Sequence, residues 1–320
     1  MSEFRLTTVE EFEAATARLL ETGAKVGADS WQARVKNQTP HCKFGEEGIC
    51  CRICTMGPCR ITKKAPRGIC GCDVHGIVGR NYLKFTAGGA SAHSDHGREI
   101  CHTLYETAAD GCYKVKDPEK LIRIAKEWGM ETEGKDIYEL AHEVALEGLM
   151  EYGKPFGTQR FLKRAPESQQ KLWEENELAP YAIDREVSRS LHMTHMGCSS
   201  KPEALVKQAI RCGLGDGWGG SMMGTEFSDI LFGTPKPIET EANLGVMVEE
   251  NVNIVVHGHD PSLSEMICEV ADSPEMIAYA KEQGAKGITI SGVCCTSNEV
   301  AMRRGIPMAG NFLQQENVVL

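Results

Sequence analysis

The sequence has little of what marks membrane proteins and nucleotide-binding enzymes. Aromatic residues make up only 6% of its 320 residues, and its apolar runs fall well short of the roughly 20 residues that span a bilayer. No Lys-Ser or Lys-Thr follows the glycine-rich stretch 213–224, and no G-x-G-x-x-G follows a strand-like segment. We therefore expect no membrane span, no phosphate loop and no dinucleotide site.

Excess positive charge and an export signal are also lacking. The formal net charge is −10, so nothing indicates a nucleic-acid partner. The first residues, MSEFRLTTVEE, carry acids and no apolar core, which is not the pattern of a signal peptide. Fourteen cysteines without such a signal predict a reducing, cytoplasmic setting and metal ligation rather than disulfides.

Six of the fourteen cysteines fall in the 29 residues from Cys42 to Cys70. Four of them are spaced as Cys51-x2-Cys54-x4-Cys59-x10-Cys70. The x2 spacing lets two thiolates turn toward one metal centre, and Gly57 and Pro58 hold the next ligand on a turn. Four thiolates from one segment are what a cubane 4Fe-4S cluster needs.

Two other interpretations of these four cysteines stay open. Paired cysteines also hold zinc, and unligated cysteines form disulfides. Charge favours the cluster: residues 34–84 carry ten basic and three acidic side chains, a balance of plus seven in an acidic chain. A cubane with four thiolates is negative, and nearby cations help set its potential. A merely solvated basic surface is the alternative explanation.

Cys42 and Cys50 are left over, because two cysteines cannot complete a cubane. A second copy of the chain can supply the other two across a two-fold axis. The pair therefore predicts a homodimer joined by a shared 4Fe-4S cluster.

The run C-K-F-G-E-E-G-I-C-C-R-I-C-T-M-G-P-C-R at residues 42–60, followed by G-I-C-G at 68–71, resembles the anaerobic nickel–iron–sulfur carbon monoxide dehydrogenases. The resemblance covers the catalytic subunit, which also occurs in acetyl-CoA synthase complexes. It implies that Cys42 and Cys50 hold the cluster shared between subunits, and that the four following cysteines hold a second cubane. Cys72 lies beyond the matching motif and is not included.

The first 243 residues are expected to form an all-helical domain that carries the cysteine segment. Helical spacing and caps predict helices over 8–24, 73–112, from Asp117-Pro118 onward, and over 137–152, 167–175, 185–195 and 202–212, before the glycine-rich stretch interrupts the pattern. Three histidines in the second helix, His93, His96 and His102, form a lane roughly 13 Å long. Solvated histidines are the alternative, but the resemblance implies a proton relay.

Residues 244–320 predict the start of a Rossmann-like α/β domain. Strands are expected over 251–256 and 287–292, with a helix over 264–284 between them and another over 297–304. Both strands end in loops that carry metal-binding side chains, H-G-H-D-P and C-C, and parallel strands bring such loops to one edge. The resemblance assigns His259 and Cys295 to a Ni-Fe-S centre.

The resemblance implies that CO and water are converted reversibly to CO2, with electrons passing through 4Fe-4S clusters to ferredoxin. An acetyl-CoA synthase subunit is a further possible partner. The family's subunit is about twice as long, and its remaining active-centre cysteines lie in a second half, so the chain is expected to be truncated. The alternatives are a non-catalytic iron–sulfur electron-transfer subunit, a hybrid-cluster redox protein and a zinc-bound structural domain.

Overall fold

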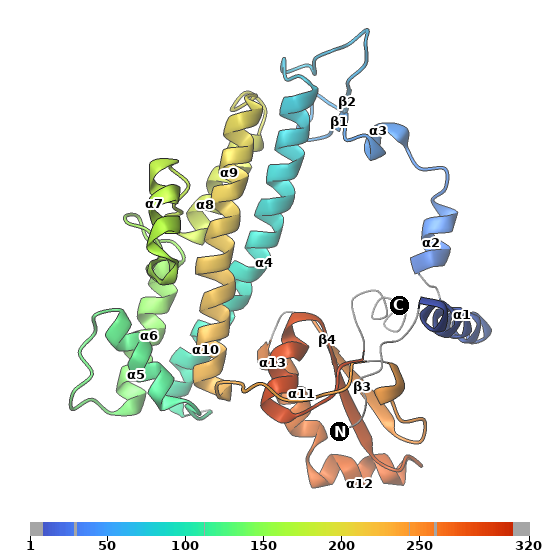
Figure 1. Cartoon of the computed structure of the whole chain (residues 1–320), viewed down its shortest axis with the longest axis vertical. Coiled ribbons are helices and arrows are strands. Elements are labelled where there is room, and N and C mark those ends of the chain that lie inside the picture. The colour runs from blue at the N-terminus through green and yellow to red at the C-terminus, as the bar shows by residue number, and fades with distance from the viewer. Residues whose placement is uncertain (1–8, 29–30, 112, 243, 259–260, 310–320) are drawn as a thin grey trace. The chain divides into compact units, whose positions relative to one another are not determined.

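The computed structural model describes residues 9–28, 31–111, 113–242, 244–258 and 261–309 (Figure 1). Two compact units make up the chain. One is Cys42–Thr234, and the other combines Met1–His41 with Pro235–Leu320. The division by contacts thus falls at Pro235, and the expected domain boundary after residue 243 stays a prediction.

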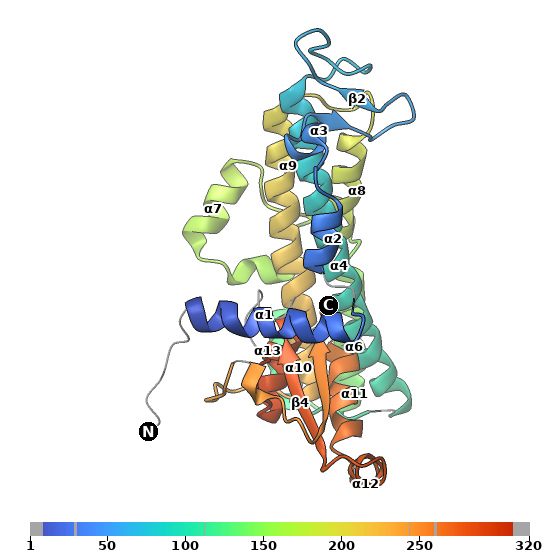
Figure 2. The ribbon, with the colours of Figure 1, turned by 90° about the vertical axis from the view of Figure 1, so that its right-hand side faces the viewer.

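One helix of 37 residues, α4 (Val74–Asp110), is the axis of the Cys42–Thr234 unit (Figures 1 and 2). The Asp73 carboxylate caps it by accepting a hydrogen bond from the Gly76 backbone N–H at 2.9 Å. Gly111 ends it in the left-handed conformation, with φ of 71°. At 1.5 Å per residue the helix is about 55 Å long, and it confirms the helix expected over 73–112.

Other helices of this unit pack along α4 and bury its apolar face, which includes Leu83, Ile100 and Leu104. The elements in chain order are α3 (Lys43–Glu46), β1 (Cys50–Cys51), β2 (Cys59–Arg60), α5 (Pro118–Glu127), α6 (Ile137–Glu151), η1 (Arg160–Arg164), α7 (Glu167–Glu175), α8 (Ile183–Thr194), α9 (Pro202–Gly215), η2 (Asp216–Ser221) and α10 (Met222–Phe232). The helices expected from caps and periodicity are therefore confirmed.

The glycine-rich stretch does not interrupt the helix, so that expectation was wrong. Helix α9 passes into the π-helical η2 and on into α10 without a break. The glycines serve packing, because a Cβ on Gly220 would lie 2.7 Å from Ile183 Cδ1, and one on Gly219 would collide with Gln159. Tertiary packing thus overrides the low helix propensity of glycine.

The second unit contains a parallel strand pair, β3 (Val252–His257) and β4 (Ile288–Val293). Its other elements are α1 (Val9–Lys25), α2 (Trp31–Asn37), η3 (Leu244–Val246), α11 (Pro261–Ala271), α12 (Pro274–Glu282) and α13 (Cys294–Arg304). Val256, Cys268, Ile290 and Val300 form the buried core between the strands and their helices. The expected βαβ order is confirmed, while completion into a Rossmann-like domain stays a prediction.

One expected helix, over 264–284, is in fact two helices. Ser273 accepts a hydrogen bond from the Met276 backbone N–H, and Pro274 occupies the first turn of α12. A Ser-Pro pair inside a helical pattern is a start signal for a new helix, so the break was readable from the sequence.

Across the described ranges, no helix is long and apolar enough to cross a membrane. The observed fold is mostly helical with two small sheets, β1–β2 and β3–β4.

Gly97 allows a close approach between α4 and the backbone of residues 220–224. A Cβ at this position of α4 would lie 3.0 Å from the Gly220 carbonyl oxygen and 3.3 Å from the Gly224 nitrogen, and would collide with the Tyr152 hydroxyl. We predict that Gly97→Ala lowers the free energy of unfolding by about 1–3 kcal/mol, because backbone atoms cannot move aside cheaply.

Gly88 in the same helix is the matched control. It is exposed and an added Cβ meets nothing within 4 Å. Gly88→Ala should therefore raise the free energy of unfolding by about 1 kcal/mol through helix propensity. Urea unfolding of anaerobically purified protein measures both variants, and equal effects at the two positions would contradict the packing account.

Candidate metal centre

The cysteine segment folds around a two-stranded antiparallel hairpin. Strands β1 and β2 pair Cys51 with Cys59, and the chain between them forms a tight loop. Gly57 is required in that loop, because a Cβ would lie 3.2 Å from both the Cys51 carbonyl oxygen and the Cys59 nitrogen. The pairing thus places the first and third cysteines of the motif side by side, with Cys54 between them.

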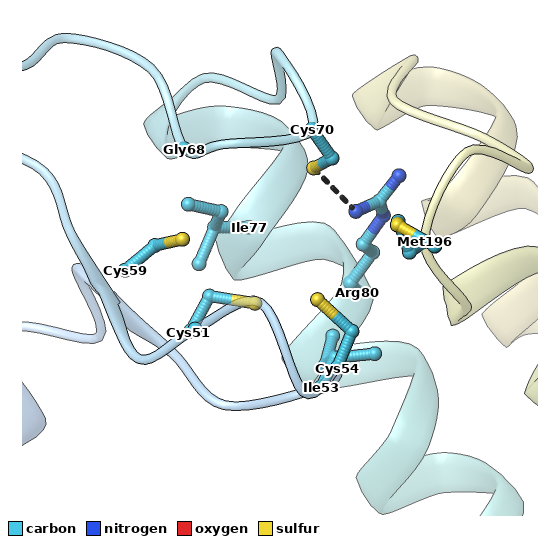
Figure 3. Close-up of a pocket in the computed structure, with 10 residues that line it drawn as sticks. Cys51, Ile53, Cys54, Cys59, Gly68, Cys70, Ile77, Arg80 and Met196 are labelled. Atoms are coloured by element: carbon cyan, nitrogen blue, oxygen red, sulfur yellow. Dashed lines mark hydrogen bonds between the residues drawn. The ribbon is translucent and has the colours of Figure 1, made fainter.

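Four cysteines of the motif line one pocket, together with Ile53, Ile77 and Arg80 (Figure 3). The four are Cys51, Cys54, Cys59 and Cys70. Their sulfur atoms turn toward a shared space, although Cys70 comes from a separate loop that follows β2 (Figure 3). The structure therefore brings together all four residues that the spacing singled out.

A single zinc ion and a cubane place different demands on four thiols. A zinc ion with bonds of about 2.3 Å to sulfur needs its ligands converged to about 3.8 Å from each other. Within the described residues, no three His, Cys, Asp or Glu side chains converge in the way a single ion requires. In a cubane each cysteine binds its own iron, so the thiols can stand apart around the pocket.

Hydrogen bonds from the protein reach two of these sulfurs. Arg80 Nη1 lies 3.5 Å from Cys70 Sγ, and the Ile69 backbone N–H donates to Cys59 Sγ at 3.4 Å. Burial opposes ionisation of the Cys70 thiol, but the hydrogen bonds from Cys72 and Arg80 prevail and lower its pKa. These contacts therefore favour the thiolate form of Cys70, which is the form that binds metal.

Cys72, two residues after Cys70, does not line the pocket. It is fully buried, and it packs with Cys51 and Ile77. Burial raises the pKa of its thiol. Its protonated, buried side chain behaves as a small apolar core residue.

Cys42 and Cys50 lie next to the pocket in sequence but do not line it. Cys42 is exposed at the start of α3, and Cys50 is partly buried in β1. An exposed, incomplete pair is what a site shared with a second copy requires, and the shared cluster stays a prediction.

Of the three histidines predicted to form the relay, His93 faces the π-helical η2 and His96 faces the start of α10. His93 Nδ1 lies 2.7 Å from Asp216 Oδ1, and the His96 ring packs against Gly224, whose added Cβ would lie 3.4 Å from Cε1. His102 is exposed and nine residues from His93, which places it half a turn around the helix. The three side chains therefore do not share one face of α4, and the proton relay stays a prediction.

Asp216, the hydrogen-bond partner of His93, was not singled out by the sequence. Its hydrogen bond to His93 raises the pKa of the imidazole, against the opposing effect of burial. The only signal in the sequence was its place among glycines, and π-helical segments are frequent at functional sites.

The predicted nickel ligands follow the paired ends of the two parallel strands. His257 of β3 is in register with Val293 of β4, so residues 259 and 295 each lie two positions beyond this pair. His259 lies outside the described residues, and so does the side chain of Cys295. Helix α13 begins at Cys294, so the cysteine pair opens a helix and not the expected loop.

Residues 49–320 match the Prismane/CO dehydrogenase family. The chain belongs to this family. Carbon monoxide dehydrogenase 1 of Methanosarcina mazei is 44% identical over 316 residues, which is 97% of this chain and 50% of that protein. The chain thus spans about half the length of this curated relative.

Solved structures of CO dehydrogenases show the same fold over the same half. The nickel-free enzyme of Thermococcus sp. AM4 is 48% identical, with a TM-score of 0.89 over 95% of this chain and 49% of its own. An acetyl-CoA synthase/carbon monoxide dehydrogenase is 41% identical, with a TM-score of 0.87 over 96% of this chain and 46% of its own. Its alpha subunits are described as holding NiZn[Fe4S4] and NiNi[Fe4S4] clusters.

We predict that Cys59→Ser removes about four irons per chain, because the pocket loses one of four ligands. Cys198→Ser, at an exposed cysteine outside the pocket, and Cys72→Ala, at the buried one, should both keep full iron. Iron analysis and visible absorbance of anaerobic protein measure the difference. Iron loss in Cys72→Ala equal to that in Cys59→Ser would contradict the assignment of the four ligands.

We predict that Asp216→Asn lowers stability more at pH 6 than at pH 9. A raised folded-state pKa of His93 stabilises the fold fully below the unfolded pKa of about 6.5, and this contribution disappears as the pH rises through the folded value. Urea unfolding at the two pH values provides the test, with the exposed Asp95→Asn on α4 as control. If Asp216→Asn lowered the free energy of unfolding by the same amount at both pH values, His93 and Asp216 would not form a stabilising imidazolium–carboxylate pair.

Proposed function

We propose that the chain is the N-terminal half of a carbon monoxide dehydrogenase catalytic subunit. The reaction is CO + H2O → CO2 + 2 H+ + 2 e−, and it is reversible. The observation that carries the proposal is the pocket of Cys51, Cys54, Cys59 and Cys70, in a chain that is 44% identical to a CO dehydrogenase over 97% of its length.

The residues of the pocket fit a 4Fe-4S cluster. Four thiols point inward, the apolar side chains of Ile53 and Ile77 form part of the wall, and the Arg80 guanidinium offsets negative charge. Such a cluster supplies reversible one-electron storage. The protein's own contribution is to hold the four sulfurs, to donate hydrogen bonds to Cys59 and Cys70, and to limit access of water.

Cys42 and Cys50 fit half of a second site, which a second copy of the chain completes as a homodimer. The pair directly precedes the ligands of the first cluster, so the two sites stay close along the chain. Electrons leave by this route to an external carrier, for which we propose ferredoxin.

His259 and Cys295 are proposed as ligands of the Ni-Fe-S centre. Support comes from the register of His257 with Val293, which brings the carboxyl ends of both strands to one edge. A chain reaches about 3.6 Å per residue at most, so two residues beyond each strand keep both side chains near that edge. The further ligands that such a centre needs are proposed to lie in the half of the subunit that this chain does not span. A nickel ion there supplies Lewis-acid activation of the substrate.

His93 and His96 are proposed to carry protons away from the reaction, with Asp216 holding the His93 imidazole in one orientation. His102 is proposed as the exposed end of the relay, reached through solvent. An acetyl-CoA synthase subunit is proposed as a further partner, since one similar solved structure is such an assembly. A reducing cytoplasm suits the abundance of thiols.

The alternative is that this half acts only as an electron carrier. It is favoured by the pocket itself, because four cysteines from this segment suffice for an electron-carrying cluster. Nickel content of the purified protein separates the two possibilities.

We predict that Cys295→Ala in the full-length gene product abolishes nickel binding and lowers CO oxidation at least about 100-fold, since losing a direct ligand exceeds second-shell effects. His259→Ala should do the same. The iron of the Cys51–Cys70 site should stay, because its ligands are separate. Nickel analysis and CO-dependent viologen reduction measure both effects.

His257→Ala is the control for these variants, because it changes the other histidine of the same segment. It should keep nickel and most of the activity. Full activity of both Cys295→Ala and His259→Ala would contradict the proposed nickel site.

A further inference from the structure

Arg80 is a buried cation at the wall of the cysteine pocket. Only 2% of the residue is exposed. It stands two turns into α4, and its Nη1 points at Cys70 Sγ at 3.5 Å (Figure 3). The other side of the guanidinium binds a different segment, with Nε donating to the Ser199 carbonyl oxygen at 2.7 Å and Nη2 donating to the same atom.

This guanidinium has no carboxylate partner in the described part of the chain, and its hydrogen bonds go to a neutral carbonyl and a thiol. Other buried cations of the same unit do pair with acids: Lys120 with Asp229, and Arg211 with Glu186 at 2.8 Å. An arginine stays charged, and a buried charge is costly without a counter-charge. The counter-charge of Arg80 must therefore come from the sulfur side of the pocket.

We propose that Arg80 is the counter-ion and hydrogen-bond donor of the cluster held by Cys51, Cys54, Cys59 and Cys70, and that it raises the reduction potential of that cluster. The inference rests on the proposed function, since it needs a cubane in the pocket. Reduction adds one electron and neither makes nor breaks a bond. The reduced cluster carries one more negative charge, so a fixed cation stabilises it more than the oxidised cluster.

Arg80 also ties the loop between α8 and α9 to the cluster. Met196 of this loop lines the pocket, and Ser199 accepts both guanidinium hydrogen bonds. The loop lies directly on α4, because a Cβ on Gly76 would lie 2.8 Å from the Ser200 carbonyl oxygen. Arg80 thus holds this loop against the side of the pocket that faces α8 and α9. Because the loop shields that side from water, the charge of Arg80 acts on the proposed cluster more strongly.

Three substitutions separate charge from hydrogen bonding. Arg80→Lys keeps the positive charge but loses the guanidinium that donates to Ser199 and Cys70 at once. Arg80→Gln keeps a hydrogen-bond donor without the charge, and Arg80→Met removes both the charge and the donor. Arg67→Met is the matched control, since Arg67 belongs to the same basic segment but is exposed. The full-length protein is purified anaerobically, and each reduced cubane signal is followed by electron paramagnetic resonance during a redox titration.

We expect the reduction potential of one cubane to be lowered least in Arg80→Lys, more in Arg80→Gln and most in Arg80→Met. The potentials of the other clusters should stay unchanged. At the wild-type midpoint, the ratio of reduced to oxidised cluster in Arg80→Met should drop on the order of tenfold. Arg67→Met should change this ratio far less, because solvent screens an exposed charge. Iron content of the Lys and Gln variants should equal that of the wild type.

Two results would overturn the inference alone. One is a full complement of iron with unchanged potentials in all three Arg80 variants. The other is loss of the cluster in all three with retention in Arg67→Met, which would leave Arg80 only a structural role. Absence of any cubane signal in the wild-type protein would instead contradict the proposed function on which the inference rests.

Discussion

The proposed bonding of four cysteine sulfurs to a metal cluster, at the N-terminal end of α4, is the interaction on which the cysteine segment depends. The segment has little secondary structure of its own, because β1 and β2 contain two residues each and α3 contains four. Its apolar cluster is small, with Cys51, Cys72 and Ile77 as the buried members. So little buried area cannot offset the entropy of ordering about 30 residues. The proposed cluster, by bonding four cysteines at once, supplies the missing free energy, as metals do in other small metal-bound segments.

The long helix α4 carries residues of both proposed sites along its length. Its first turns present Ile77 and Arg80 to the pocket, and its middle places His93 against η2 and His96 against α10. Close packing at Gly97 lets η2 and α10 approach the helix, and this approach brings Asp216 within 2.7 Å of His93. Contact distance therefore explains Gly219 and Gly220, whereas an added Cβ on Gly213 or Gly217 would meet nothing within 4 Å.

Patterns among neighbouring residues predicted most of the helices and strands, but they could not predict contacts between residues far apart in the sequence. The caps at Asp73 and at Asp117-Pro118, the strand pair and the four-cysteine set follow from neighbouring residues, whose spacing is a property of the sequence alone. Arg80 and Asp216 carry no such local signal, because their roles arise from partners 119 and 123 positions away. The unbroken helix through the glycines was missed for the same reason, while the break at Ser273-Pro274 was a local signal that the helical periodicity obscured.

The most direct test is an X-ray diffraction map at the iron absorption edge, from crystals of the full-length protein grown without oxygen. The account predicts anomalous density for a four-iron cube between Cys51, Cys54, Cys59 and Cys70, with the Arg80 guanidinium beside the Cys70 sulfur. A single zinc peak with sulfur ligands at about 2.3 Å, or sulfur–sulfur bonds between these cysteines, would contradict it.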